Sequence, residues 1–125
     1  MLNSLLSKVE TVYIAYGATD FRQQITSLCN IVKNTFKLNP YGKDAYIFCN
    51  KKRNSIRVLC YDKNGFILAQ KTLIDTEKMK FQWPKNKVEM KEITKEQVNW
   101  LLSGLSIEPK KYFKEIEIEE KNIAI

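Results

Sequence analysis

The sequence predicts an α+β fold with a mainly antiparallel sheet. Three observations lead to this prediction: alternating apolar and polar segments rich in β-branched and aromatic residues, short polar turns between them, and one longer stretch with helical spacing of its apolar residues. The chain has 125 residues, 44% hydrophobic and 28% charged, which suits a globular protein with one core. We expect one domain over residues 1–107 and a charged tail over 108–125.

A strand followed by a helix is predicted at the start of the domain. Residues 9–15 (VETVYIA) alternate in polarity and are rich in β-formers, which indicates a strand. Residues 21–36 carry apolar side chains at a spacing near 3.6, which predicts an amphipathic helix packed on the sheet. Thr19 or Asp20 is expected to be its N-cap. The turn residues of 39–42 (NPYG) end this helix.

Three strands joined by two short turns are predicted next. The strands are residues 45–49 (AYIFC), 55–61 (SIRVLCY) and 66–74 (FILAQKTLI). A polar tip at 50–54 (NKKRN) joins the first two, and 62–65 (DKNG) contains the Asn-Gly pair typical of hairpins. This pattern predicts a three-stranded meander, half-buried against the helix.

The last part of the domain is predicted to hold short elements. Short strands are expected at residues 79–82 and 87–90, within otherwise irregular chain. Thr94 followed by Gln97 fits a capping box, so residues 95–102 (KEQVNWLL) are expected to form a short amphipathic helix. The region from 106 to 125 is charged with alternating Ile residues, which suits an edge strand, a tail or an oligomer contact.

The charge of the chain favours a polyanionic partner. The net charge is +7, and it is uneven: residues 1–95 hold 17 basic and 8 acidic residues, a net +9, whereas residues 96–125 hold 4 and 6, a net −2. The net charge of a chain determines the electrostatic field around the protein and therefore its partners, but it does not indicate the fold. A lysine-rich composition without any nucleic-acid contact explains the total equally well.

The cysteine and histidine content argues against most metal and catalytic sites. Three cysteines occur without CxxC spacing, and there is no histidine, so we expect no metal site and no cofactor. The cysteines are expected to be reduced and buried, as in a cytoplasmic protein. The commonest general base is missing, so we expect no enzyme. The sequence shows neither a signal peptide nor an apolar run long enough for a membrane span.

The most concentrated positive charge lies at the predicted tip of the first hairpin. Hairpin tips let cations reach out to phosphates, and such binding depends strongly on salt. The alternative is an ordinary solvated turn. The nucleic-acid-binding candidates are Lys51, Lys52, Arg53 and Arg57, with Lys63, Lys71 and Arg22 as weaker ones.

Other side chains suggest chemistry less strongly. Exposed aromatic residues stack on unpaired bases, but most aromatic residues here fit apolar faces and are expected in the core. The aromatic candidates are Tyr16, Tyr41, Tyr46, Tyr61, Trp83 and Trp100. Asp20 and Asp62 are the carboxylates that a small metal-dependent nuclease would use, although both suit turn or cap roles. Arg22 opposes the helix dipole in a first turn, so we expect it to pair with Asp20 or another carboxylate, or to bind a ligand.

Six strings in order resemble one family. They are residues 12–15 with 20–22 (VYIA, DFR), 39–42 with 46–48 (NPYG, YIF), 50–54 with 56–59 (NKKRN, IRVL), 61–66 with 71–73 (YDKNGF, KTL), 81–84 (FQWP) and 100–105 (WLLSGL). In order and spacing the chain resembles, from about residue 9 to 107, the second-open-reading-frame protein of the insertion sequence 66 family. It departs from that pattern at Tyr61, where the family favours Trp, at Thr72, where it favours a second basic residue, and over 75–80.

This resemblance implies a transposase accessory protein with no catalytic residues of its own. The expected partners are the DNA of the element, its separate transposase, or both, and the sequence is compatible with a homo-oligomer. One alternative is a protein-binding adaptor that docks the transposase through a sheet face or the Trp83-Pro84 loop without touching DNA. The second alternative is the small nuclease.

Overall fold

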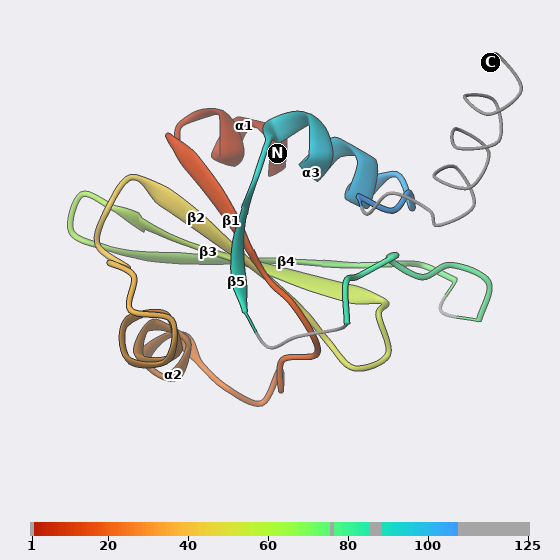
Figure 1. The fold of residues 1–125 in the computed structure, drawn as a ribbon, viewed down its shortest axis with the longest axis horizontal. Helices are drawn as coiled ribbons and strands as arrows, with labels where there is room; N and C mark the ends of the chain where they lie inside the picture. Colours follow the sequence, from red (N-terminus) through yellow and green to blue (C-terminus); the bar gives the residue numbers. More distant parts are fainter. Residues whose placement is uncertain (1, 76, 86–88, 108–125) are drawn as a thin grey trace, which may run out of the picture.

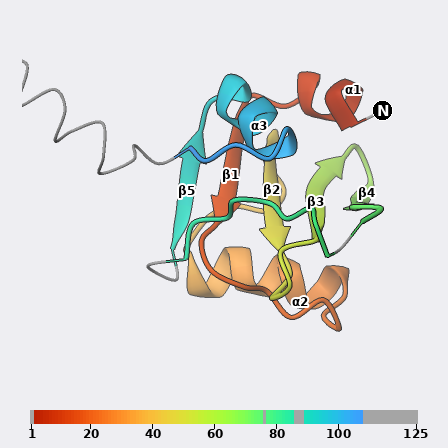
Figure 2. The ribbon, with the colours of Figure 1, turned by 90° about the vertical axis from the view of Figure 1, so that its right-hand side faces the viewer.

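A five-stranded sheet lies between two layers of helix (Figures 1 and 2). The computed structural model describes residues 2–75, 77–85 and 89–107. In chain order the elements are α1 (Leu2–Ser7), β1 (Thr11–Ala15), α2 (Ile25–Asn30), the π-helical turn η1 (Ile31–Thr35), β2 (Asp44–Cys49), β3 (Ser55–Asp62), β4 (Gly65–Thr72), β5 (Met90–Ile93) and α3 (Lys95–Leu102). The predicted α+β class is confirmed. The predicted tail at 108–125 lies outside the described residues.

The strand order of the sheet is β4-β3-β2-β1-β5, and all but one of the neighbouring pairs are antiparallel. The strands β2, β3 and β4 follow one another in chain and in space. The exception is β1 with β2, which pair in parallel because the chain crosses over through α2 between them. Both β1 and β2 therefore end at the same edge of the sheet.

Each face of the sheet contributes to its own apolar cluster. Ile56, Val58 and Cys60 of β3 face α1 and α3, whereas Leu59 faces α2 together with buried Leu28. This alternation is the ordinary one of a β-strand, in which successive side chains point to opposite faces of the sheet. Both layers of helix are visible in Figure 2, with α2 on one side of the sheet and α1 and α3 on the other.

The helix over α2 and η1 begins later than predicted. Its first residue is Ile25, and its N-cap is Gln24, which makes no side-chain cap bond. Two carbonyl groups before it, of Phe21 and Gln23, accept hydrogen bonds from the Arg57 guanidinium at 2.7 and 3.1 Å. Because Arg57 and a local turn at Asp20 occupy this segment, the prediction of a helix from residue 21 with Thr19 or Asp20 as N-cap is wrong.

The described residues of the segment 73–85 form no strand, so the strand predicted at 79–82 is wrong. Its backbone crosses the ends of the sheet strands instead, and Phe81 and Trp83 enter the core 1% and 5% exposed. The strand predicted at 87–90 begins at Met90 as β5; of the remainder, residues 87 and 88 lie outside the described ranges.

Two helices cover the face opposite α2. The helix α3 begins at the predicted capping box: Gln97 N donates to Thr94 Oγ1 at 3.0 Å, and Thr94 N donates to Gln97 Oε1 at 2.8 Å. The helix α1 has no counterpart in the sequence predictions, although its Leu6 is 5% exposed and packs in the same cluster. Within the described ranges, no helix has the length and hydropathy of a membrane span.

Candidate nucleic-acid interface

The turn between β2 and β3 is held by its two asparagines. Asn50 Nδ2 donates to Asn54 Oδ1 at 2.6 Å, and Asn50 Oδ1 accepts from the backbone N–H groups of Asn54 and Ser55, both at 3.1 Å. Arg53 takes a left-handed conformation with φ of 59°, which closes the turn. The asparagines thus satisfy the turn internally, and Lys51 and Lys52 are exposed at its tip.

None of these three cations forms an ion pair with a described carboxylate. The ion pairs within 4.0 Å among the described residues join Arg22 to Asp20 and Lys43 to Glu10. Three consecutive positive charges without acidic partners repel one another, so a polyanion at this turn gains from all of them. The fourth cation here is Lys85, which lies with Lys51 and Arg53 around one hollow.

Lys85 was not among the residues predicted for this site. It comes from the crossing segment 73–85, and the sequence gives no periodic signal that places this segment beside the β2–β3 turn. The contact depends on a backbone hydrogen bond from Phe81 N to Arg53 O at 2.7 Å. We refer to Lys51, Lys52, Arg53 and Lys85 together as the basic end.

Arg22 lies in the segment that follows β1, and that segment adjoins the end of β2 because Thr19 N donates to Cys49 O at 2.8 Å. Its side chain is 91% exposed and binds Asp20 through Nε and Nη2, with a shortest distance of 2.7 Å. The predicted pairing of Arg22 with Asp20 is therefore confirmed. The hydrogen bonds from Arg22 lower the pKa of the Asp20 carboxyl to about 2.

Arg57 is placed differently from the cations of the turn. Its Nε donates to Gln70 Oε1 at 2.8 Å, its Nη1 bonds the carbonyls of Phe21 and Gln23, and its guanidinium carbon lies 4.5 Å from the centroid of the Phe21 ring. The side chain thus joins β3 and β4 to the segment before α2. Two of its donor atoms are already used by the protein.

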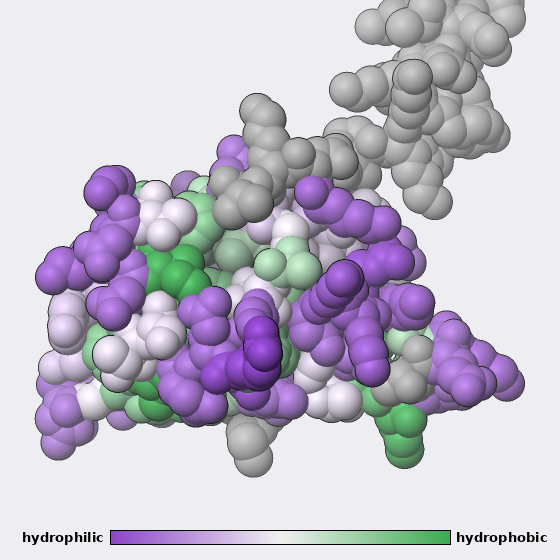
Figure 3. All heavy atoms as spheres, turned by 90° about the horizontal axis from the view of Figure 1, so that it is seen from below, coloured by the Kyte–Doolittle hydropathy of each residue, from purple (hydrophilic) through white to green (hydrophobic). Residues whose placement is uncertain are grey.

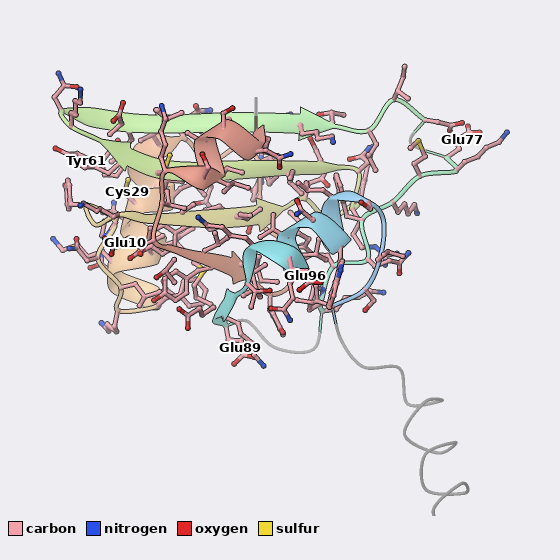
Figure 4. The ribbon with its side chains drawn as sticks, turned by 90° about the horizontal axis from the view of Figure 1, so that it is seen from above. Glu10, Cys29, Tyr61, Glu77, Glu89 and Glu96 are labelled. Carbon is pink, nitrogen blue, oxygen red and sulfur yellow. The ribbon has the colours of Figure 1, made fainter. Side chains whose placement is uncertain are left out.

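Of the remaining two candidates, Lys63 is far from the basic end, and Lys71 lies at the same end of the sheet but on its α1 and α3 side. Lys63 lies in the β3–β4 turn, at the other end of these strands. Lys71 pairs with Ile56 across β3 and β4, so it faces the side of α1 and α3, whereas Arg57 faces α2. Figure 4 shows the length of the sheet between Tyr61, next to the β3–β4 turn, and Glu77 in the crossing segment. One face does not hold all seven predicted cations.

Three of the six aromatic candidates lie in the core, and Tyr61 is half-buried. Tyr16, Tyr46 and Trp83 are buried, whereas Tyr41 and Trp100 are 58% and 39% exposed. The Trp83 indole N–H donates to Ala15 O at 2.8 Å, and Pro84 is buried too. The Trp83-Pro84 loop therefore does not offer the docking surface that the adaptor alternative predicted for it.

The three cysteines are free thiols, of which Cys49 and Cys60 are buried and Cys29 is half-buried. Burial raises the pKa of the Cys49 thiol to about 12 and also raises the pKa of Cys29 and of Cys60. A thiol with a raised pKa is a poor nucleophile and a poor metal ligand at neutral pH.

The carboxylates proposed for a nuclease lie far apart. The segment with Asp20 adjoins Cys49, which pairs with Ile56, and Asp62 lies six residues further along β3. At the rise of an extended strand this separation is roughly 20 Å, too far for both to bind one metal ion. In the described part of the chain, no group of three or more Cys, Asp or Glu residues is arranged to hold a metal. The geometry contradicts this pair as an active site.

Comparison with protein families gives a match over most of the chain. The family model described as IS66 Orf2 like protein matches residues 10–112, which is most of the chain. No curated protein and no solved structure matches. The family is one of transposition accessory proteins and is not a known enzyme family. From the fold, the ordered motifs and this match, the chain belongs to the IS66 Orf2 like protein family.

Proposed function

We propose that this protein assists transposition by binding the DNA of its element through the basic end. The family supplies the accessory role. The observation that supports DNA as the partner is the group of four cations at one end of the sheet, of which Lys51, Lys52 and Lys85 are exposed. Phosphates bind such cations by releasing counterions, without any need for base-specific contacts.

The other predicted cations have different parts in this proposal. Arg57 positions the segment before α2 and does not itself contact phosphate, because Nε and Nη1 are engaged with protein acceptors. Arg22 can add a phosphate contact if its guanidinium leaves the Asp20 carboxylate and binds a phosphate group instead. Lys63 and Lys71 are outside the interface. The surface seen from below in Figure 3 is mostly hydrophilic, with hydrophobic side chains in small separate patches.

A salt titration tests the proposal. Binding of the full chain to a labelled duplex is measured by fluorescence anisotropy at several salt concentrations. Each phosphate contact contributes about 0.9 to the slope of log K against log salt, so K51A/K52A/R53A should flatten the slope by about 3. The control variant K33A/K37A/K63A removes three exposed lysines elsewhere and should change the slope by less than about 1.

Two results would overturn the proposal. One is no binding of the unaltered protein to duplex DNA at low salt. The other is an equal loss of slope from the two triple variants, since that would show that net charge alone governs binding.

A groove between α1, α3 and β4 favours a second candidate function, binding to the element's transposase. The family implies association with a transposase. The groove has a volume of about 860 Å³, and Leu2, Leu5, Leu102 and 38% exposed Ile67 contribute its apolar lining. A transposase segment with apolar side chains fits this lining.

The substitution Ile67→Asp tests this second candidate. It places a charge in the groove and should weaken pull-down of the element's transposase at least tenfold, because an unpaired charge would be desolvated there. DNA binding should not change, since Ile67 pairs with Cys60 near the β3–β4 turn, at the other end of the strands from the basic end. Unchanged transposase binding would exclude this groove as the docking site.

A further inference from the structure

A hollow opens at the edge of the sheet where the parallel strands β1 and β2 both end. It has a volume of about 300 Å³ and is lined by three segments that follow different elements. The lining residues are Gly17, Ala18, Asn50, Lys51, Arg53, Trp83, Pro84 and Lys85. Ligands commonly bind outside the carboxyl ends of parallel strands, where the connecting chains diverge. We call this feature the strand-end hollow.

Backbone hydrogen bonds tie the walls of the strand-end hollow together. Gly17 N donates to Pro84 O at 2.8 Å, and Thr19 N donates to Cys49 O at 2.8 Å. Phe81 N donates to Arg53 O at 2.7 Å, and the Trp83 indole donates to Ala15 O. Because all three segments are joined, the hollow is preformed and does not depend on a ligand to assemble it.

The lining combines an apolar interior with a cationic rim. Ala18 is exposed, and the largely buried Trp83 and Pro84 contribute only the edges that reach the hollow; none of the described lining residues is a carboxylate. Lys51, Arg53 and Lys85 bring three positive charges to the same place. The side chain of Asn50 is occupied by the turn itself. This combination fits a ligand that has a flat apolar group and a negatively charged group attached beside it.

We propose that the strand-end hollow takes one unpaired nucleobase of DNA, with the lysines and arginine on its flanking phosphates. This inference rests on the proposed DNA binding and adds its substrate class. A volume of about 300 Å³ suits a single base and excludes a base pair within a duplex. A base must leave its stack to enter such a site, which is easiest where it is already unpaired.

The experiment compares two probes with the full-length protein. One is a duplex, and the other is the same duplex with a single unpaired nucleotide at its centre. Contacts to one base strengthen binding by several-fold to about a hundredfold, so we expect at least fivefold tighter binding of the second probe. A third probe, with an abasic nucleotide at the unpaired position, keeps the backbone and should lose this preference.

Variants at Ala18 test whether the preference for the unpaired nucleotide depends on the strand-end hollow. Ala18 is exposed and lines the strand-end hollow, so Ala18→Trp fills it without removing a charge. We expect this variant to bind both probes equally, with duplex affinity unchanged. The matched control Ala18→Ser leaves the space open and should keep the preference. If Ala18→Trp proves unfolded by circular dichroism, the smaller Ala18→Leu takes its place.

The outcomes separate this inference from the proposed function. No binding to any probe overturns both. Binding to duplex without preference for the unpaired base overturns only the inference. A preference that survives filling at Ala18 also overturns it. So does a preference that is lost in Tyr41→Ala, because exposed Tyr41 packs with half-buried Tyr61 and Phe66 near the other end of the sheet.

Discussion

Arg57 illustrates how a residue on a strand can determine where a helix begins. Its guanidinium takes the carbonyl oxygens of Phe21 and Gln23, which would otherwise accept hydrogen bonds within a helix. The planar fork of arginine suits two acceptors and a stacked ring at once. The charge that made Arg57 a phosphate candidate in the sequence is used inside the fold.

The substitution Arg57→Lys should therefore lower stability although it keeps the charge. A lysine cannot bridge Gln70 and both carbonyls, and the loss should be about 1–3 kcal/mol in the free energy of unfolding. Urea denaturation measures it. Arg22→Lys is the control, since Arg22 is exposed and pairs only with Asp20, so its effect should stay within about 0.5 kcal/mol. Equal effects of the two substitutions would contradict this role of Arg57.

The pair of Asp20 and Arg22 predicts a pH dependence. The folded pKa of Asp20 is about 2, below its ordinary value of 3.8, so the pair stabilises the fold above about pH 4 and this contribution is lost as the pH falls toward 2. NMR titration of the Asp20 carboxyl should give the low midpoint. In Arg22→Gln the midpoint should rise toward 3.8, and a midpoint that does not move would refute the assignment.

At the scale of elements, the sequence predicted correctly those strands and helix ends that depend on residues close together in the chain. The strands β1 to β4 and the capping box of α3 follow from alternation and cap residues. The start of α2 could not be predicted in this way, because Arg57 is 34 or more residues away in sequence from the carbonyl groups to which it donates. The strand prediction within the segment 73–85 was wrong for the same reason, because Phe81 and Trp83 are held by hydrogen bonds to residues distant in sequence.

The capping box gives a prediction for α3. Thr94→Ala removes the acceptor for Gln97 N and should destabilise the protein by about 1 kcal/mol. The effect reaches the core because Val98 and Leu101 of α3 are buried. Thermal denaturation measures the change, and Thr94→Ser should restore most of it. A full loss in the serine variant would show that the threonine methyl group, and not the cap, carries the effect.

At the scale of the whole molecule, the sheet is completed by its last described elements. The strand β5 pairs with β1, and α3 covers the cluster that contains Val12 and Ile14. The sequence predicted that the most concentrated positive charge lies at the turn between β2 and β3. It did not predict the basic end as a whole, because Lys85 joins that end only through the tertiary path of residues 73–85.

Truncation tests the proposed domain of residues 1–107. A chain that ends after Ile107 should keep its free energy of unfolding within about 0.5 kcal/mol. A chain that ends after Lys85 loses β5 and α3, exposes much of one apolar cluster and should be unfolded. Circular dichroism and urea denaturation distinguish these cases. A folded shorter chain, or an unfolded longer one, would move the domain boundary.

The hydrogen bond from the Trp83 indole to Ala15 O joins residues 68 positions apart. Contacts of such separation form late, because the entropy of closing a long loop must be overcome before they contribute. The β2–β3–β4 hairpins are local and can form first. A partly folded chain would thus already display the charges of Lys51 to Arg53, but it would lack the hollow beside them, so shape selectivity would arise only in the final stage of folding.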